Sequence, residues 1–169
     1  MPITHKQVNL FDSEAVFLLH QVNCRGVMGS GVAKQVRERY PEVYEAYHAF
    51  CDGCDTPSNL LGLIEPEPIA DNQWIVNCFA QDDYGRDCRH TDYEALRTAL
   101  NFVAGIASCF CILTHFPGDL PLIAIPYKMG CDRGGGDWKN VVEPMIKEIL
   151  GDYNTVICHL EPVKEVCTL

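Results

Sequence analysis

The stretch AVFLLHQVNCRGVMGSGVAKQVRERYP, residues 15–41, joins an apolar run to a helical pattern through a glycine-rich loop. The apolar run, 15–22, has the composition of a strand that is covered on both faces. The loop GVMGSGVA, 26–33, follows, and its glycines let the backbone turn with positive φ and let N–H groups approach a ligand. Residues 30–40 then place apolar side chains on one helical face. This succession predicts a strand, a ligand-binding turn and a helix.

A second unit of the same kind lies later in the chain. The apolar run LPLIAIP, 120–126, precedes the loop GCDRGGGDW, 130–138. The first turn of a helix offers unsatisfied N–H groups and the positive end of the helix dipole, so such a junction suits phosphate. In open α/β sheets the ligand lies outside the carboxyl ends of the strands. We therefore expect the turns at Met28 and Arg133 to face each other across one cleft. The cleft would hold a ligand with more than one phosphate, or with phosphate and ribose at separate places.

The remaining sequence alternates between strand-like and helix-like segments. Residues 109–116 fit either a strand or a continuation of the helix before them. The alternation predicts a three-layer α/β fold, and a chain of 169 residues without repeats or linkers predicts one domain over residues 1–169. The predicted strands span residues 7–10, 15–22, 60–65, 73–79, 120–126 and 155–160, and the predicted helices span 30–40, 43–50 and 91–108.

Two helix starts carry specific signals. Thr91 and Glu94 form a capping box for the helix over 91–108. Asp137 is a good N-cap for a later helix, but Pro144 lies too deep in that helix to be a first-turn proline. We therefore expect a kink, or a short 3-10 turn before a helix that starts near Glu143.

The charge and the composition restrict the partners. The formal net charge of −10 at pH 7 argues against a nucleic-acid-binding surface. An anionic ligand would then depend on backbone donors and on nearby cations, for which Arg25, Lys128 and Arg133 are the candidates. No apolar run approaches the ~20 residues of a membrane span, and the N-terminus lacks the pattern of a secretory signal. Several of the ten cysteines lie within apolar runs, so we expect a cytoplasmic protein with free thiols.

Other ligand motifs fit poorly. A dinucleotide fold needs an acidic residue about 20 residues after the glycines, whereas the next predicted strand begins near Leu60. The chain has no G-K-[ST] sequence, no cysteine followed six positions later by arginine, and no aspartate cluster typical of a two-metal site. Cys51 and Cys54 form one C-x-x-C pair without a second pair, which favours a surface turn with two free thiols. No metal site is therefore expected.

His20 ends the first apolar run, just before Asn23 and the first glycine loop. An imidazole with an unperturbed pKa of about 6.5 can act as a general base at neutral pH. A hydrogen-bonded histidine at a strand end is the alternative. Position alone does not separate the two.

Five stretches together resemble the macro domain family, whose members bind ADP-ribose. They are HQVNCRGVMGSGVAKQVRERYP (20–41), SNLLGLI (58–64), WIVNCFAQDDYG (74–85), the loop that runs from Ile-Pro through glycines to Trp (125–138) and VICHL (156–160). The resemblance is closest to the branch that hydrolyses ADP-ribose 1″-phosphate. In that branch a strand ends in His, Asn follows three residues later, and a glycine loop leads to a helix ending in Tyr-Pro. The resemblance implies a three-layer α/β/α sandwich with a central mixed sheet.

The resemblance also implies roles for individual residues, and it implies neither a metal nor another cofactor. His20, Asn23 and Asp132 would be catalytic. Asn9 would lie near the adenine, the first loop near the distal ribose and its phosphate, and the second loop along the diphosphate. The implied ligand-binding residues are Asn9, Gly26, Val27, Met28, Gly29, Ser30, Gly31, Val32, Tyr84, Gly130, Cys131, Arg133, Gly134, Gly135, Gly136 and Trp138.

The implied function is ADP-ribose binding with metal-independent hydrolysis of ADP-ribose 1″-phosphate. One alternative is a hydrolase that removes ADP-ribose from protein or nucleic acid, and another is a non-catalytic reader of ADP-ribose or of ADP-ribosylated macromolecules. In a related branch that removes ADP-ribose from protein carboxylates, a lysine and an aspartate carry the chemistry. Here the lysine position reads Ala80 or Gln81 and the aspartate position falls on Gly134, with Asp132 and Asp137 nearby.

Overall fold

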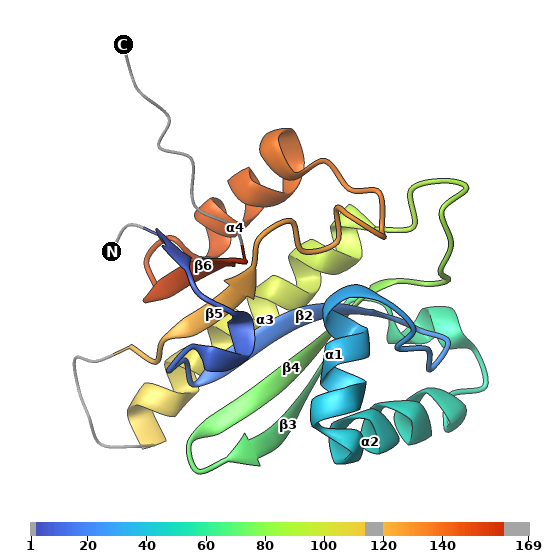
Figure 1. Ribbon diagram of the computed structural model, residues 1–169, viewed down its shortest axis with the longest axis horizontal. Coiled ribbons are helices and arrows are strands. Elements are labelled where there is room, and N and C mark those ends of the chain that lie inside the picture. Colours follow the sequence, from blue (N-terminus) through green and yellow to red (C-terminus); the bar gives the residue numbers. More distant parts are fainter. Residues whose placement is uncertain (1–2, 114–119, 161–169) are drawn as a thin grey trace.

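One sheet of six strands organises the structure, a computed structural model that describes residues 3–113 and 120–160 (Figure 1). The strands lie in the order β1-β6-β5-β2-β4-β3. β3 runs antiparallel to β4, and the other neighbouring pairs are parallel, so the sheet is mixed. The strands are β1 (Thr4–Gln7), β2 (Phe17–Asn23), β3 (Ile64–Ala70), β4 (Gln73–Gln81), β5 (Ile123–Pro126) and β6 (Thr155–His159).

Helices cover both faces of this sheet (Figure 1). On one face lie α1 (Gly31–Arg39) and α2 (Pro41–Asp52), and on the other lie α3 (Tyr93–Leu113) and α4 (Glu143–Leu150). Because successive side chains of a strand point to opposite faces, each face builds its own apolar core. This is the three-layer α/β/α sandwich with a central mixed sheet that the sequence predicts.

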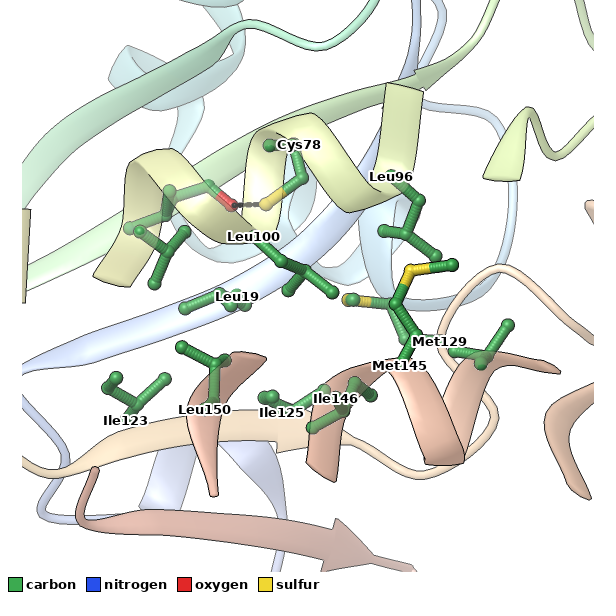
Figure 2. Close-up of a cluster of buried hydrophobic side chains, with 14 of the residues drawn as sticks. Leu19, Cys78, Leu96, Leu100, Ile123, Ile125, Met129, Met145, Ile146 and Leu150 are labelled. Atoms are coloured by element: carbon green, nitrogen blue, oxygen red, sulfur yellow. Dashed lines mark hydrogen bonds between the residues drawn. The ribbon is translucent and has the colours of Figure 1, made fainter. Parts of the chain in front are cut away.

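The larger core lies between the sheet and the helices α3 and α4 (Figure 2). Leu19 of β2 and Ile125 of β5 project from the sheet, and Leu100 of α3 and Ile146 of α4 pack against them. All four side chains are fully buried. Full burial of such a side chain contributes about 1.5–3 kcal/mol, so apolar packing is the main force that holds these helices to the sheet.

The sheet changes its winding direction between β2 and β5. From β2 the chain passes through α1 and α2 toward β3 and β4, whereas from β5 it passes through α4 to β6 on the opposite side. β2 and β5 pair only at Phe17 with Ile123 and at Leu18 with Ala124. Beyond these residues the two strands part. Ligands of α/β sheets bind in the crevice that such a switch point opens.

The first predicted strand is wrong in position. The sequence predicts a strand over 7–10, but β1 ends at Gln7, and Leu10 begins a 3-10 turn. The side-chain oxygen of Asn9 caps this turn by accepting a hydrogen bond from the N–H of Phe11 at 3.0 Å. Asparagine offers the backbone this alternative to strand pairing, which explains the difference.

The third predicted strand also lies too early in the chain. The sequence predicts a strand over 60–65, but Pro57–Leu60 form a 3-10 turn and pairing begins at Ile64. β3 carries Pro66 and Pro68, although proline cannot donate to a strand ladder. The strand tolerates both prolines because it lies at the edge of the sheet, where one side needs no partner.

The helix α3 uses a different cap from the predicted capping box of Thr91 and Glu94. The carboxylate of Asp92 accepts a hydrogen bond from the N–H of Ala95 at 2.9 Å and so caps the helix. The hydroxyl of Thr91 donates instead to the carbonyl oxygen of Gly130 at 2.6 Å. Asp and Thr both cap helices well, so a long-range contact decides which of the two does so here.

The same helix continues to Leu113, so the ambiguous segment 109–116 is helical as far as the description reaches. Residues 114–116 lie outside the described residues. Among the helices described, none has both the length and the apolar composition needed to cross a membrane.

The last helix begins where predicted, after a turn of a different kind. Asp137 caps the turn, since its carboxylate accepts a hydrogen bond from the N–H of Asn140 at 3.0 Å. Trp138–Val142 form a π turn rather than a 3-10 turn, and α4 follows from Glu143. Pro144 explains the wider turn, because proline has no N–H to donate and its ring crowds the carbonyl four residues earlier.

The C-x-x-C pair divides between the interior and the surface. Cys51 and Cys54 are free thiols, as expected. Cys51 is buried, however, because it lies one turn after Tyr47 on the inward face of α2. Cys54 is partly exposed and donates to the carbonyl oxygen of Thr56 at 3.2 Å. The prediction of a surface position is therefore correct for Cys54 and wrong for Cys51.

The core predicts a specific stability difference. Leu100→Ala would leave a cavity between α3 and the sheet, and it should lower the free energy of unfolding by about 2–5 kcal/mol. The same change at Leu63, which is 37% exposed before β3, should cost less than half as much. Urea denaturation of both variants measures the difference. Equal losses would contradict this assignment of the core.

Candidate functional site

A cavity of about 560 Å³ opens at the carboxyl ends of β2, β4, β5 and β6. The first glycine loop lines it through Gly29 and Gly31, and the second through Gly130 and Gly134. The two loops therefore face each other across one cleft, as the sequence predicts. The cavity lies at the switch point between β2 and β5.

Most of the predicted site residues line this cavity. They are His20, Asn23, Val27, Gly29, Ser30, Gly31, Val32, Tyr84, Gly130, Asp132, Arg133 and Gly134. The predicted residues outside its lining are Asn9, Gly26, Met28, Cys131, Gly135, Gly136 and Trp138.

Four of the residues outside the lining have contacts that serve the fold. Met28 is 1% exposed and packs in the core beside α1 and α2, and Trp138 is 7% exposed and packs in the core beside α3 and α4. Asn9 caps the turn after β1. The thiol of Cys131 donates to the carbonyl oxygen of Met129 at 3.3 Å. The glycine-rich motifs therefore locate the two loops correctly. Some residues of these motifs, however, pack in the core or hydrogen-bond within the loop and do not line the cavity.

The side chain of Asn23 holds the first loop in shape. Its oxygen accepts hydrogen bonds from the N–H groups of Arg25 (2.9 Å) and Val27 (3.2 Å) and from the hydroxyl of Tyr47 (2.9 Å). Its amide nitrogen donates to the carbonyl oxygen of Val27 at 2.6 Å. Burial raises the pKa of Tyr47, which keeps this hydroxyl protonated as a donor. Asn23 thus positions the loop and has one amide hydrogen left for a ligand.

The first turn of α1 is open toward the cavity. Ser30 is the N-cap, but within the described part of the chain its hydroxyl makes no capping hydrogen bond. Gly31 and Val32 line the cavity. The first N–H groups of a helix have no intrahelical acceptor, and the helix dipole favours negative charge there. This turn therefore suits a phosphate.

The second loop is fixed by hydrogen bonds to the start of α3. Thr91 donates to the carbonyl oxygen of Gly130, and the N–H groups of His90 and Thr91 donate to the carbonyl oxygen of Gly134 at 2.9 and 3.0 Å. Gly130 has a φ of +72°, and a Cβ at this position would overlap the side-chain oxygen of Gln21. The positive φ favours glycine at this position, and a Cβ would also displace the end of the Gln21 side chain.

His20 is buried at the cavity with one ring nitrogen unsatisfied. Its Nε2 lies 2.5 Å from Oδ1 of Asn77, whose Nδ2 donates to Glu65 at 3.0 Å. Because an amide oxygen can only accept, Nε2 of His20 carries the proton and Nδ1 keeps a lone pair. No described residue bonds to Nδ1. Burial lowers the pKa of His20 to about 4, although the bond to Asn77 raises it, so the ring is neutral at pH 7.

Gln21 and Gln81 are cavity residues that the sequence analysis missed. Nε2 of Gln21 donates to Oε1 of Gln81 and to Oγ1 of Thr91, both at 2.8 Å. Oε1 of Gln21 is buried and has no hydrogen-bond partner among the described residues. Gln81 reaches this network because Ala80 is an extra residue in β4 opposite the end of β2, a bulge that redirects the next side chain. The signal that could have identified Gln21 as a site residue is its position as a polar residue inside an apolar run.

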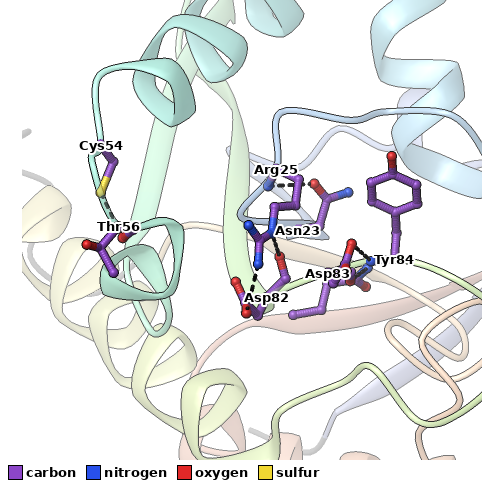
Figure 3. A network of polar contacts seen from close by, with 8 residues as sticks. Asn23, Arg25, Cys54, Thr56, Asp82, Asp83 and Tyr84 are labelled. Atoms are coloured by element: carbon purple, nitrogen blue, oxygen red, sulfur yellow. Dashed lines mark hydrogen bonds and ion pairs between the residues drawn. The ribbon is translucent and has the colours of Figure 1, made fainter.

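Three cations line the cavity of this acidic protein. Lys128 and Arg133 are the ones that the sequence predicts, and Arg86, from the loop after β4, joins them. Arg25 lies outside the lining, because its guanidinium pairs with the carboxylate of Asp82 at 3.2 Å (Figure 3). The prediction of Arg25 as an anion-binding residue is therefore not supported by its position.

Two further predicted residues stand at the rim. Tyr84 is 53% exposed, and its ring stands apart from the pair of Arg25 and Asp82 (Figure 3). Asp132 is exposed on the second loop and lines both this cavity and a smaller adjoining hollow. Both side chains are free to meet a ligand that projects from the cleft.

The cavity offers groups that suit an anionic ligand. The loop N–H groups and the nearby cations suit phosphate oxygens. His20 Nδ1 and Gln21 Oε1 are buried acceptors without a described partner, and leaving such an atom unsatisfied costs about 1–3 kcal/mol. They belong to consecutive residues of β2, whose side chains point to opposite faces of the sheet.

Comparison with known proteins gives sequence relatives of two kinds, while no family model matches the chain. The DNA ADP-ribosyl glycohydrolase of Mycobacterium tuberculosis is 26% identical over 157 residues, which cover 92% of this chain and 41% of that protein. The ADP-ribose 1″-phosphate phosphatase of Aspergillus oryzae is 41% identical over 46 residues, which cover 27% of this chain and 23% of that protein. The chain spans about two-fifths of the length of the glycohydrolases that it matches.

Solved structures agree on the fold. The macrodomain of Mycobacterium tuberculosis DarG superposes with a TM-score of 0.73 at 21% identity, covering 95% of this chain and 98% of that one. The Thermosipho africanus DarTG structure in complex with ADP-ribose superposes with a TM-score of 0.74 at 18% identity, covering 98% of this chain and 44% of that one. The chain has the macrodomain fold, as its sequence predicts.

The buried His20 predicts a pH dependence of stability. In the unfolded chain its pKa returns to about 6.5, so between pH 6.5 and 4 the unfolded state binds a proton that the folded state excludes. Stability therefore falls as the pH falls through this window. From pH 7 to pH 5 this group should remove about 2 kcal/mol from the free energy of unfolding.

Urea denaturation of wild type and His20→Gln at both pH values isolates this contribution, since other titrating groups are common to the two proteins. The variant should lose about 2 kcal/mol less than wild type. Parallel losses in both proteins would rule out the assignment.

Proposed function

We propose that this protein with a macrodomain fold binds ADP-ribose in the cavity and hydrolyses its link to a macromolecule, with ADP-ribosylated DNA as the first substrate to test. The glycohydrolase relatives match over 92% of the chain, whereas the phosphatase relatives match short segments, so sequence similarity favours this function over the phosphatase. The observation that carries ligand binding is one cavity between the two glycine loops, lined by the uncapped first turn of α1 and by Arg86, Lys128 and Arg133.

The strand order supports one orientation of ADP-ribose. The lining follows four neighbouring strands, from Leu160 after β6 and Tyr127 after β5, past β2, to Gln81 at the end of β4. Neighbouring strands lie ~4.8 Å apart, so the site spans about 14 Å. We place the adenine at the aromatic and apolar end near Tyr127 and Leu160, and the diphosphate between the glycine loops. The distal ribose then lies near His20 and Gln21.

Hydrolysis replaces the bond from C1″ of the distal ribose to the macromolecule with a bond to a water oxygen. The water loses a proton, and the leaving group gains one. We assign proton acceptance to Asp132 and orientation of the water or of a ribose hydroxyl to Nδ1 of His20, which is unprotonated at neutral pH. Loop N–H groups stabilise the negative charge on the phosphates. The lysine position of the related branch falls on Ala80 or Gln81 here, and neither side chain has a basic nitrogen, so the chemistry depends on the other two residues.

Hydrolysis of ADP-ribose 1″-phosphate is the second candidate function. Asn23, three residues after His20, favours it, because the resemblance to the phosphatase branch rests on this spacing, although His20 lies in the middle of β2 and Asn23 ends the strand. In that reaction the phosphate at C1″ would lie against the first turn of α1, where Ser30 leaves the N–H groups uncapped.

Turnover of three substrates separates the candidates. The purified protein is incubated with an ADP-ribosylated DNA oligonucleotide, an ADP-ribosylated protein and ADP-ribose 1″-phosphate, and free ADP-ribose and phosphate are measured. We expect ADP-ribose release from the oligonucleotide, with kcat lowered about a hundredfold or more by His20→Ala and by Asp132→Asn. Asp152→Asn, an exposed change in the turn after α4, serves as the matched control and should keep the wild-type rate.

Release of phosphate from ADP-ribose 1″-phosphate, without release of ADP-ribose from the other two substrates, would make the phosphatase the favoured function. ADP-ribose binding without turnover of any substrate would make the protein a reader and would refute the hydrolase.

A substitution in the first loop tests the phosphate site directly. A Cβ at Gly29 would meet Val27 at an ordinary 3.7 Å, so a side chain fits there while projecting at the cavity wall. Gly29→Glu adds a carboxylate beside the proposed phosphates and should weaken ADP-ribose binding about a hundredfold, ~2.7 kcal/mol. Gly105→Glu on the exposed side of α3 is the matched control. Calorimetry that finds equal affinities for both variants would exclude this site.

A further inference from the structure

A cluster of three potential metal ligands lies outside the cavity lining, in the loop between β4 and α3. Asp87, Cys88 and His90 each offer one ligand atom, and these atoms lie within 4.8 Å of one another. Nε2 of His90 is 3.0 Å from Oδ1 of Asp87 and 3.7 Å from Sγ of Cys88. The expectation of no metal site rests on the unpaired C-x-x-C motif and on the lack of an aspartate cluster, and neither signal includes this segment.

Two of the three spacings between these atoms are close to the edges of a tetrahedral zinc site. With Zn–N and Zn–O bonds of ~2.0–2.1 Å and a Zn–S bond of ~2.3 Å, tetrahedral angles place N and O about 3.3 Å apart and N and S about 3.6 Å apart. The two observed distances differ from these values by a few tenths of an ångström. We propose that Asp87, Cys88 and His90 form a binding site for a borderline transition-metal ion of the Zn²⁺ class.

The arrangement argues against a catalytic Cys-His-Asp triad. A triad uses one ring nitrogen toward the thiol and the other toward the carboxylate. Here Cys88 and Asp87 both approach the same nitrogen, Nε2 of His90. Three ligand atoms within 4.8 Å of one another can share one metal ion. The mixed oxygen, nitrogen and sulfur set also disfavours Mg²⁺ and Ca²⁺, which select oxygen ligands.

The surrounding backbone holds the three residues in place. The N–H of His90 donates to the carbonyl oxygen of Gly134, which ties the segment to the second glycine loop. A Cβ at Gly85 would lie 2.5 Å from Oδ1 of Asp87 and 2.8 Å from Nε2 of His90, so glycine leaves the room that the ligand atoms occupy. The site is thus supported from two sides.

Three protein ligands leave one coordination position for water or another donor. Cys88 lines a hollow of about 390 Å³ that it shares with Arg86, Asp132 and Arg133. Asp132 and both arginines line the main cavity as well. A metal ion here would therefore sit at the rim of the proposed ADP-ribose site, and its binding is independent of whether that proposal holds. Cys88 would bind as the thiolate and release its proton to solvent.

Titration of the purified chain with Co²⁺ tests the site, because a cobalt–thiolate bond gives charge-transfer absorption in the near ultraviolet and a tetrahedral ion gives strong visible bands. We expect one equivalent of Co²⁺ to bind with both signals and Zn²⁺ to displace it. Cys88→Ala and Asp87→Asn, both exposed, should weaken binding at least about tenfold, and Cys88→Ala should also abolish the charge-transfer band.

Among the described residues, the other thiols that are not buried are those of Cys54, Cys109 and Cys131, so Cys54→Ser, Cys109→Ser and Cys131→Ser are the matched controls, and each should bind Co²⁺ as wild type does. Circular dichroism of each variant confirms that it is folded. Absence of stoichiometric binding to wild type overturns the proposal. So does a cobalt–thiolate signal that survives in Cys88→Ala or disappears in any control.

Discussion

β2 and β5 pair over only two residues of each strand, and the candidate ligand site depends on this pairing being so short. Past Leu18, β2 keeps β4 as its partner as far as Asn23, and past Ala124, β5 keeps β6 as far as Pro126. The strands diverge because their crossovers run to opposite sides of the sheet. The space between them receives both glycine loops and the side chain of Gln21. A longer pairing would close this space with ladder hydrogen bonds, and the loops would have no common cavity to line.

Several polar residues at the cleft use their hydrogen bonds to hold the loops in shape and do not keep them free for a ligand. Asn23 uses most of its hydrogen bonds on the first loop, and Thr91 joins the second loop to β2 through Gln21. Such side chains fix where N–H groups point, which preorganises the site before a ligand arrives. Nδ1 of His20 and Oε1 of Gln21 are buried and have no described partner. The site thus presents N–H donors whose directions are fixed before a ligand binds.

Local charge, rather than net charge, governs the electrostatics of the cleft. The chain carries a formal net charge of −10, yet Arg86, Lys128 and Arg133 gather around the cavity. At physiological ionic strength, exposed charges more than about 8 Å apart are largely screened, so an anion in the cleft senses mainly these neighbours. The acidic composition therefore does not exclude a phosphate ligand. Nor does it exclude a nucleic-acid substrate of which only one modified group enters the cavity.

The sequence by itself determined the alternation of strands and helices, the three layers and the place of both glycine loops, because apolar periodicity and glycine are local signals that survive in any α/β arrangement. It also marked His20 and Asp137 correctly as a cavity residue and a helix cap. Only the tertiary structure decided that Thr91 locks a distant loop while Asp92 caps α3, that Trp138 is core, and that a bulge at Ala80 brings Gln81 into the cleft. These outcomes depend on partners far away in the chain, and the hydrogen-bonding and burial demands of those partners have no local signature in the sequence.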